Sequence, residues 1–439
     1  MNKIKELIEN LGLKTFIDHN LAFKNNARIY DWFLDNRICA LPMEGWDATK
    51  DGKPSDVTLM RWKRYGASGV SLVWGEAAAV SMDARSHFKQ LVLIDKNQKE
   101  FEELLLVTKK QRENSFGKES LKTFRVGIQL LHGGRFAKPK PMPVFHDEYL
   151  DRATKIDPSI NVISDEEIEK IIEDYIKAAI LAKKIGFDFI DIKLCHGYLG
   201  HEILGAKKRQ GKYGGPIENR TRFIREIAEA LKREAKGIKI ASRISFFEPP
   251  AKHGLKNPDY SHFGVKKENP YEWDINEWEK LLNILLKLDI KLIAPSLGTP
   301  YTTPWLVRPA KKKALFENDP PEHWIKGIER HIKTSQILKK LCPEMNIVIA
   351  GLSALGSHLL QIGASLLENK ICDFVGLGRS LLANPELPKL LLSKDILDEK
   401  ILCKACGLCT TMARKGKFAG CYLHDHFYKK FILNGKDGG

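Results

Sequence analysis

Four cysteines lie within the last forty residues of this 439-residue chain. Three form the run CKACGLC at 403–409, and the fourth follows after eleven further residues. Two-residue gaps let neighbouring thiolates bind one ion or cluster, and a thiolate from a longer loop completes a four-sulfur shell. The other four of the eight cysteines are scattered singly, unlike a disulfide framework. The pattern predicts a metal site, and its spacing fits zinc or iron–sulfur. The expected ligands are Cys403, Cys406, Cys409 and Cys421.

The elements that position these residues follow an alternating pattern. Short apolar, β-prone runs alternate with longer amphipathic segments from about residue 36 to residue 395, as in a parallel β/α fold. Eight such runs indicate a closed barrel, so the predicted fold class is α/β: a (β/α)8 TIM barrel with a short C-terminal cysteine-rich extension. The predicted strands are 37–42, 70–75, 124–130, 189–193, 238–242, 292–296, 346–350 and 373–376.

One helix has clear end signals. Ser164 is placed to cap its first turn together with Glu167, and Gly186 is placed to end it. Three long connections, 136–163, 246–274 and 297–324, each follow a predicted strand. All three therefore belong to the C-terminal face of the barrel, where they are expected to form substrate walls or plain surface insertions.

Composition places the chain among soluble globular proteins, with 43% hydrophobic and 29% charged residues. No apolar run approaches the roughly 20 residues that span a bilayer. The first twelve residues have helical apolar spacing with two glutamates, which predicts a surface helix and not a targeting peptide. We therefore expect a cytoplasmic protein with no membrane partner.

The net charge of +16 comes mainly from dispersed lysines, with one tight run at 311–313. No nucleic-acid-binding motif accompanies this charge, so we interpret it as a solvated basic surface and expect no nucleic-acid partner. Such a surface suits an acidic redox partner or a phosphorylated substrate.

Five separated motifs carry a family resemblance. HGYL at 196–199 and YGGPIENRTRF at 213–223 resemble the signature of the old yellow enzyme family of FMN-dependent NADH:flavin oxidoreductases. NRICALPM at 36–43, GEAAAV at 75–80 and QLLHGGR at 129–135 are similar to that family's first three strand motifs. The resemblance covers roughly residues 25 to 395.

The resemblance implies an FMN site. An isoalloxazine needs a backbone wall and an amide at its pyrimidine edge, and a guanidinium near N1 stabilises the anion formed on reduction. Phosphate is expected after the seventh and eighth strands, where glycines allow close backbone approach and an arginine neutralises charge. The implied contacts are Ala40, Pro42, Met43, Ala77, Gln129 and Arg243 for the ring, and Ala350, Gly351, Gly378 and Arg379 for the phosphate.

The fourth strand ends with a departure from the family. Many relatives carry a His-x-x-His or His-x-x-Asn pair that grips a carbonyl oxygen, whereas here Lys193 replaces the first histidine and His196 matches the second. A lysine ammonium can stabilise a developing enolate oxygen by charge, or engage a carboxylate or the flavin. The alternative is a solvated strand-end lysine. Tyr198 matches the family's substrate-facing tyrosine, which donates a proton in some members, and His201 is expected to be structural.

The cysteine run narrows the resemblance. It is similar to the four-iron cluster element of the branch that includes 2,4-dienoyl-CoA reductase and trimethylamine dehydrogenase, which favours [4Fe-4S] over zinc. This chain ends 18 residues after Cys421, without those relatives' nucleotide-binding region, and the segment 296–305 lacks the reductases' histidine. The expected division is an N-terminal extension at 1–24, an FMN-binding barrel at 25–395 and a [4Fe-4S] extension at 396–439.

The expected function is reduction of a C=C bond conjugated to a carbonyl or carboxyl group, with Lys193, His196 and Tyr198 as catalytic residues. Electrons are expected from NAD(P)H or from an acidic carrier protein. One alternative is an amine-type dehydrogenase that passes electrons out through the cluster; an aromatic cage of Trp74, Tyr198, Tyr301 and Trp305 would favour it, and Lys193 argues against it. Another is a flavin-free barrel with a structural zinc knuckle. These patterns specify neither the substrate nor the number of subunits.

Overall fold

The computed structural model describes residues 2–14, 19–250, 262–314 and 319–433. Among them, no helix combines the length and apolar character that a membrane crossing requires.

Eight parallel strands close into a barrel, as predicted. The hydrogen-bonded order is β3-β11-β10-β9-β8-β7-β6-β4, and a β3–β4 pairing completes the circle. Nearly every strand residue is buried, because the strands face packed side chains both inside and outside. Each strand overlaps one predicted run: β3 (Ile38–Ala40), β4 (Leu72–Ala79), β6 (Arg125–Leu131), β7 (Phe189–Ile192), β8 (Lys239–Ser245), β9 (Leu292–Ser296), β10 (Asn346–Ile349) and β11 (Phe374–Leu377).

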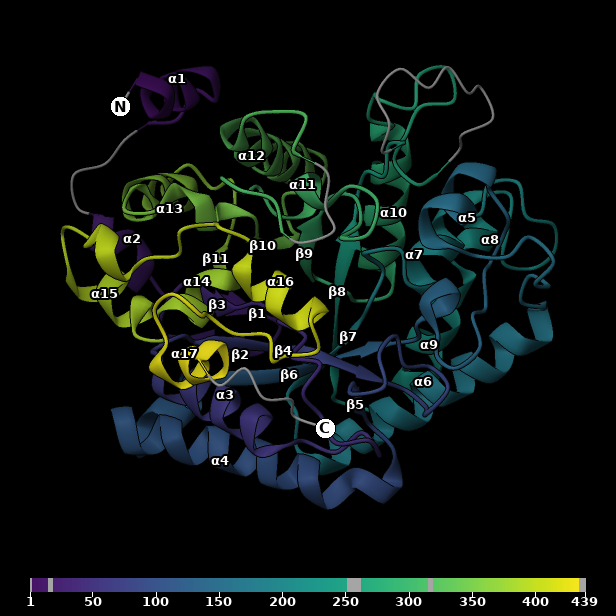
Figure 1. Ribbon diagram of the computed structural model, residues 1–439, viewed down its shortest axis with the longest axis horizontal. Helices are drawn as coiled ribbons and strands as arrows, with labels where there is room; N and C mark the ends of the chain where they lie inside the picture. Colours follow the sequence, from purple (N-terminus) through teal and green to yellow (C-terminus); the bar gives the residue numbers. More distant parts are fainter. Residues whose placement is uncertain (1, 15–18, 251–261, 315–318, 434–439) are drawn as a thin grey trace.

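Helices surround this sheet (Figure 1). The predicted ends of α6 are confirmed, since Ser164 and Glu167 form a capping box and Gly186 ends the helix with φ of 101°. The outer helices are α3 (Asp56–Ala67), α4 (Gln98–Phe116), α6 (Asp165–Ile185), α9 (Arg222–Glu234), α10 (Ile275–Lys287), α12 (Trp324–Leu341) and α13 (His358–Glu368).

The N-terminal end of the barrel is closed by an antiparallel hairpin of β1 (Ala27–Ile29) and β2 (Trp32–Leu34). The Trp32 ring packs 5.8 Å from Phe189 of β7, and Trp74 of β4 packs 5.6 Å from the same ring. Because this end is filled, the opposite end is the one open to a ligand.

Shorter elements occupy the connections. Within the described parts of 136–163 and 297–324 they are helices, while residues 251–261 of the second connection and 315–318 of the third lie outside the described residues. These elements are β5 (Leu91–Val92), α5 (Glu148–Thr154), α7 (Leu199–Gly205), α8 (Ile217–Arg220), α11 (Pro304–Val307), α14 (Arg379–Ala383) and α15 (Leu387–Ser393).

The first and last described segments pack onto the barrel. The predicted N-terminal helix is α1 (Asn2–Asn10), and Phe23 of α2 (His19–Lys24) is fully buried against Gly363 of α13. The cysteine-rich segment contains α16 (Leu408–Arg414) and α17 (His426–Leu433), and an ion pair from Arg64 of α3 to Asp425 ties it to the barrel.

Candidate active site and cysteine cavity

A cleft opens at the C-terminal ends of the barrel strands and holds about 1200 Å³ of space free of protein atoms, including its mouth. Its walls come from the segments after β3, β7, β9, β10 and β11, and from α16, which lies in yellow in front of the strands in Figure 1. Residues that were expected to bind flavin or substrate and that line this cleft are Pro42, Met43, His196, Tyr198, Arg243, Ala350, Gly351, Gly378 and Arg379.

Three expected flavin contacts lie behind this lining. Ala40 and Ala77 are buried in β3 and β4, and the amide of Gln129 in β6 donates to the buried carboxylate of Asp191. Asp191 also accepts from the indole of Trp74 at 2.6 Å and from the backbone N–H of Arg243 at 2.9 Å. In this structure Gln129 therefore helps to fix the strand that carries Arg243.

The phosphate end of the cleft has unsatisfied donors. Arg379 is 7% exposed; its Nη2 donates to Pro309 O at 2.9 Å, and its Nη1 has no hydrogen-bond partner within the described part of the chain. Gly351 has φ of 85°, and a Cβ there would stand 2.5 Å from His331. The buried Nε of Arg243 likewise lacks a partner among the described residues. A bound anion would satisfy these donors, so the residues fit FMN.

Lys193 is not solvated; it is only 1% exposed, which overturns the strand-end alternative. Its ammonium forms an ion pair with the Glu44 carboxylate and lies 4.0 Å from the centre of the Tyr198 ring. Lys193 does not line the cleft, whereas Glu44 and Tyr198 do. Binding of a carboxylate was one of the roles expected for the Lys193 ammonium, and here the carboxylate belongs to Glu44 of the same chain.

Glu44 was missed by the sequence analysis. Its Oε2 accepts from the Trp46 indole at 3.2 Å and lies 3.4 Å from the Tyr198 hydroxyl. The available signal was indirect: a lysine in a buried strand end requires a counter-charge, and Glu44 directly follows Met43 of the first-strand motif.

The loop bearing Glu44 is fixed by a buried charge network. Arg61 of α3 donates to Asp47 at 2.6 and 3.0 Å and to Glu76 at 2.9 and 3.0 Å. Glu76 in turn accepts from the backbone N–H of Gly45 at 3.0 Å. Burial raises the pKa of Glu76, and the Arg61 charge opposes that rise. The stretch just after Glu44 is thereby attached to α3 and β4.

His196 and Tyr198 present different chemistry to the cleft. His196 has φ of 66°, and its Nε2 lies 3.0 Å from the Ser296 hydroxyl. Burial and the charges of Arg243 and Lys193 hold the pKa of His196 well below its ordinary value, so it is neutral at neutral pH. A neutral imidazole can donate one hydrogen bond to a carbonyl oxygen.

The hydroxyl of Tyr198 lies 2.9 Å from that of Tyr301 and 3.3 Å from that of Ser86. Burial, with the negative charge of Glu44 next in effect, raises the pKa of Tyr198 well above its ordinary value. Tyr198 therefore holds its proton until a strong base, such as a carbanion, takes it.

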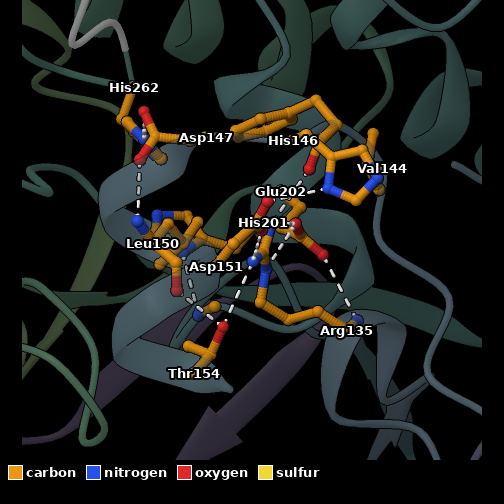
Figure 2. Close-up of polar contacts among 12 residues, drawn as sticks. Arg135, Val144, His146, Asp147, Leu150, Asp151, Thr154, His201, Glu202 and His262 are labelled. Atoms are coloured by element: carbon orange, nitrogen blue, oxygen red, sulfur yellow. Dashed lines mark hydrogen bonds and ion pairs between the residues drawn. The ribbon is translucent and has the colours of Figure 1, made fainter. Parts of the chain in front are cut away.

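His201 has the structural role that was expected. Its Nδ1 accepts the Gly197 N–H at 3.0 Å and so fixes the turn after His196. Figure 2 shows it beside a buried charge cluster in which Arg135 donates to Glu202 at 2.7 Å and to Asp151 at 2.9 Å. This cluster attaches the long connection after β6 to α7.

The four clustered cysteines, Cys403, Cys406, Cys409 and Cys421, line one small cavity. Ala405 and Gly407 have φ of 48° and 72°, which curls the loop so that its cysteines face the same space. Burial raises the pKa of the Cys403 and Cys421 thiols. Across the described residues, no three His, Cys, Asp or Glu side chains converge closely enough to hold a metal ion. Four thiols are a donor set that zinc or an iron–sulfur cluster can use.

The cavity and the cleft share a wall. Cys409, Arg379 and Leu382 line both spaces. The segment that carries the cysteines therefore also shapes the cleft.

The chain is similar in sequence to flavin-dependent oxidoreductases. Residues 28–274 match the NADH:flavin oxidoreductase / NADH oxidase family. The NADPH dehydrogenase of Bacillus subtilis is 30% identical over 257 residues, which are 53% of this chain and 71% of that protein. The NADPH dehydrogenase of Bacillus cytotoxicus is 29% identical over 362 residues, 81% of this chain and 88% of that protein.

Solved structures share the fold. A 2-naphthoyl-CoA reductase in complex with 2-naphthoyl-CoA has a TM-score of 0.72 at 16% identity over 94% of this chain, and this chain covers 58% of it. Histamine dehydrogenase from Rhizobium sp. 4-9 has a TM-score of 0.69 at 19% identity, over 94% of this chain and 53% of that one. Morphinone reductase in complex with tetrahydroNAD has a TM-score of 0.61 at 18% identity, over 86% of this chain and 92% of that one.

Proposed function

Because the chain belongs to the NADH:flavin oxidoreductase / NADH oxidase family, as its old yellow enzyme motifs indicated, we propose that this oxidoreductase reduces a C=C bond conjugated to a carbonyl or carboxyl group. The observation that carries this proposal is the pairing of a neutral His196 with a protonated Tyr198 on one wall of a cleft that also holds unsatisfied arginine donors.

FMN is the expected cofactor, and the barrel at 25–395 is its proposed domain. Arg379 and the backbone at Gly351 and Gly378 would hold the phosphate, while Pro42, Met43 and Arg243 would hold the ring. Ala350 belongs to the phosphate loop, and Ala40, Ala77 and Gln129 support these residues from behind. When bound, FMN supplies a hydride for the β-carbon of the substrate.

His196 and Tyr198 divide the remaining work. His196 donates a hydrogen bond to the activating carbonyl oxygen, which stabilises the enolate that forms. Tyr198 protonates the α-carbon. Lys193, expected to share the oxygen with His196, lies outside the cleft lining, so we assign it a different role below.

A [4Fe-4S] cluster on Cys403, Cys406, Cys409 and Cys421 is proposed for the extension at 396–439, with 1–24 as a separate N-terminal extension. The shared cavity and the four-thiol donor set support this assignment. A cluster there would supply one-electron transfer beside the cleft. The proposed electron donors are NAD(P)H and an acidic carrier protein attracted by the net charge of +16, and the proposed location is the cytoplasm.

An amine-type dehydrogenase is the second candidate, and one observation favours it. Of the expected cage, Tyr198 and Tyr301 line the cleft, whereas the buried Trp74 and the half-buried Trp305 do not. The Glu44 carboxylate and the Trp46 ring line it beside the two tyrosines, which suits an ammonium substrate. The repulsion expected from Lys193 is weakened, because Glu44 neutralises that ammonium. The third candidate, a zinc-knuckle barrel without flavin, keeps the same cysteine ligands.

An absorption spectrum of anaerobically purified protein, before and after reduction, tests these functions. We expect flavin bands and release of FMN, not FAD, by acid. The reduced protein should then be reoxidised by a cyclic enone, whereas oxidised protein should not be reduced by histamine. Reduction by the amine without reoxidation by the enone would establish the second candidate, and a colourless protein with stoichiometric zinc would establish the third.

A further inference from the structure

Tyr198 lies between two opposite charges. Lys193 lies 4.0 Å from the centre of its ring, and the Glu44 carboxylate lies 3.4 Å from its hydroxyl. Lys193 and Glu44 also pair with each other, so the three side chains form one closed set of contacts. The set joins the segments after β3 and β7, which are 149 residues apart in the chain.

The set is placed to act on the tyrosine. Lys193 is 1% exposed and outside the cleft lining, so its ammonium reaches a substrate only through neighbours. A cation under an aromatic ring interacts with the whole π system, and this interaction strengthens greatly when the ring carries a phenolate charge. Among the described residues, the Tyr301 hydroxyl, from the segment after β9, and the Ser86 hydroxyl also lie within hydrogen-bond distance of the Tyr198 hydroxyl. Burial raises the pKa of Tyr301, and the negative charge of Glu44 adds to that rise. The positive charge of Arg414 in α16 opposes it.

We propose that Lys193 and Glu44 are positioning residues for proton donation by Tyr198: Glu44 orients the hydroxyl, and Lys193 offsets the charge that remains after the proton leaves. This inference rests on the proposed function. In the step, the electron pair of the substrate carbanion forms the new C–H bond at the α-carbon. The O–H bond of Tyr198 breaks and leaves its electron pair on the phenolate. The Tyr301 hydroxyl, 2.9 Å away, then passes a proton back from solvent.

The pair solves a specific electrostatic problem. A phenolate at Tyr198 would face the Glu44 carboxylate as a second negative charge, and two close anions disfavour each other in a buried site. Lys193 contacts both groups, so it lowers the energy of the state in which both are charged. Removing Lys193 or Glu44 should therefore shift the ionisation of Tyr198 in opposite directions.

The first experiment measures that ionisation without any substrate. Holoenzyme labelled with ¹³Cζ-tyrosine is titrated by NMR, and Tyr198→Phe identifies the Tyr198 signal. We expect Glu44→Gln to move its titration to lower pH, because the Lys193 charge then acts unopposed. Adding Lys193→Met to that variant should move the titration back up, whereas adding Lys193→Arg should not. Equal titration of Glu44→Gln and Glu44→Gln/Lys193→Met would overturn the proposal.

The second experiment separates this inference from the proposed function. Stopped-flow kinetics in H₂O and D₂O follow reoxidation of the reduced enzyme by 2-methylcyclohex-2-enone. We expect Lys193→Met to slow this half-reaction by about 10²-fold, to increase its solvent isotope effect, and to leave reduction of the flavin by dithionite unchanged; Lys193→Arg should restore most of the rate. A wild-type enzyme that is not reoxidised contradicts the proposed function, and the NMR titration still decides the inference. A reoxidation rate that Lys193→Met leaves unchanged contradicts the inference alone.

Discussion

The guanidinium of Arg61 lies 2.9 Å from the carboxylate of Glu76, and both side chains are only 3% exposed. The same guanidinium binds Asp47, and Glu76 also accepts from the Trp62 indole at 2.9 Å. Helix α3, strand β4 and the loop that carries Glu44 thus meet at one buried point. Because these side chains are buried, removing any one charge would leave its partner uncompensated and lower the stability of the fold.

Replacing Arg61 with methionine should lower the free energy of unfolding by about 3–5 kcal/mol, because Asp47 and Glu76 would remain buried as uncompensated anions. Denaturant unfolding followed by circular dichroism measures the change. The control is Arg152→Met, which breaks a pair whose side chains are 79% and 89% exposed and should change stability by less than about 1 kcal/mol. Similar effects of the two substitutions would show that the Arg61 network carries no special weight.

Arg379→Ala should weaken retention of FMN by about 1.5–3 kcal/mol, or roughly ten- to a hundredfold in Kd, through loss of a charge-assisted phosphate contact. Ultrafiltration with fluorescence detection of free FMN measures this directly. Arg125→Ala is a matched control, since Arg125 begins β6 at the opposite end of the barrel. Unchanged retention by Arg379→Ala would remove Arg379 from the phosphate site.

Cys406→Ser should abolish the cluster while the barrel keeps FMN, because the cleft residues proposed to hold FMN do not include Cys406. Wild-type protein should contain about four iron and four acid-labile sulfide per chain. Cys342→Ser serves as the control, since Cys342 is buried at the end of α12, away from the cysteine cavity. Stoichiometric zinc in the wild type, lost in Cys406→Ser, would replace the cluster by a zinc knuckle.

His262 should make stability depend on pH. Burial alone would lower its pKa, but the negative charges of Asp147, 3.9 Å from its Nε2, and Glu248, 3.7 Å from its Nδ1, outweigh burial and raise the pKa to about 9. The raised pKa means that the protonated form stabilises the fold. That contribution, at most about 3 kcal/mol, is complete below pH about 6.5 and is lost as the pH rises through 9.

Unfolding measured between pH 6.5 and 9.5 tests this. His262→Gln should flatten the decline in stability that the wild type shows over this window. His331→Gln is the control: burial lowers the pKa of His331 to about 4, so it is neutral throughout and its loss should leave the slope unchanged. A wild-type slope that persists in His262→Gln would assign the decline to other groups.

The sequence was most informative where a local pattern has a single structural solution. Runs buried on both faces marked all eight barrel strands, and a capping box with a terminal glycine marked α6 at both ends. The motif residues that reach the cleft lining do so because they follow strand ends, and every strand end of a parallel barrel lies on one face.

The Lys193–Glu44 ion pair could not be predicted from local sequence patterns. The partners are 149 residues apart, and no periodicity links a strand-end lysine to a loop carboxylate. Their pairing depends on the closed barrel, which brings the ends of β3 and β7 to one face, and on the buried network at Arg61, which holds the loop of Glu44. Both are tertiary features. The share of α16 in the cleft was missed for the same reason.

Helix α16 gives the cleft a wall that the barrel does not provide. Cys409, Thr410, Ala413 and Arg414 face the same space as Met43 and Arg243, although the family match ends at residue 274. A substitution in the cysteine segment can therefore change the shape of the cleft as well as the cysteine cavity. If relatives differ in substrate, some of the residues responsible should lie in α16, and a comparison restricted to the barrel would not detect them.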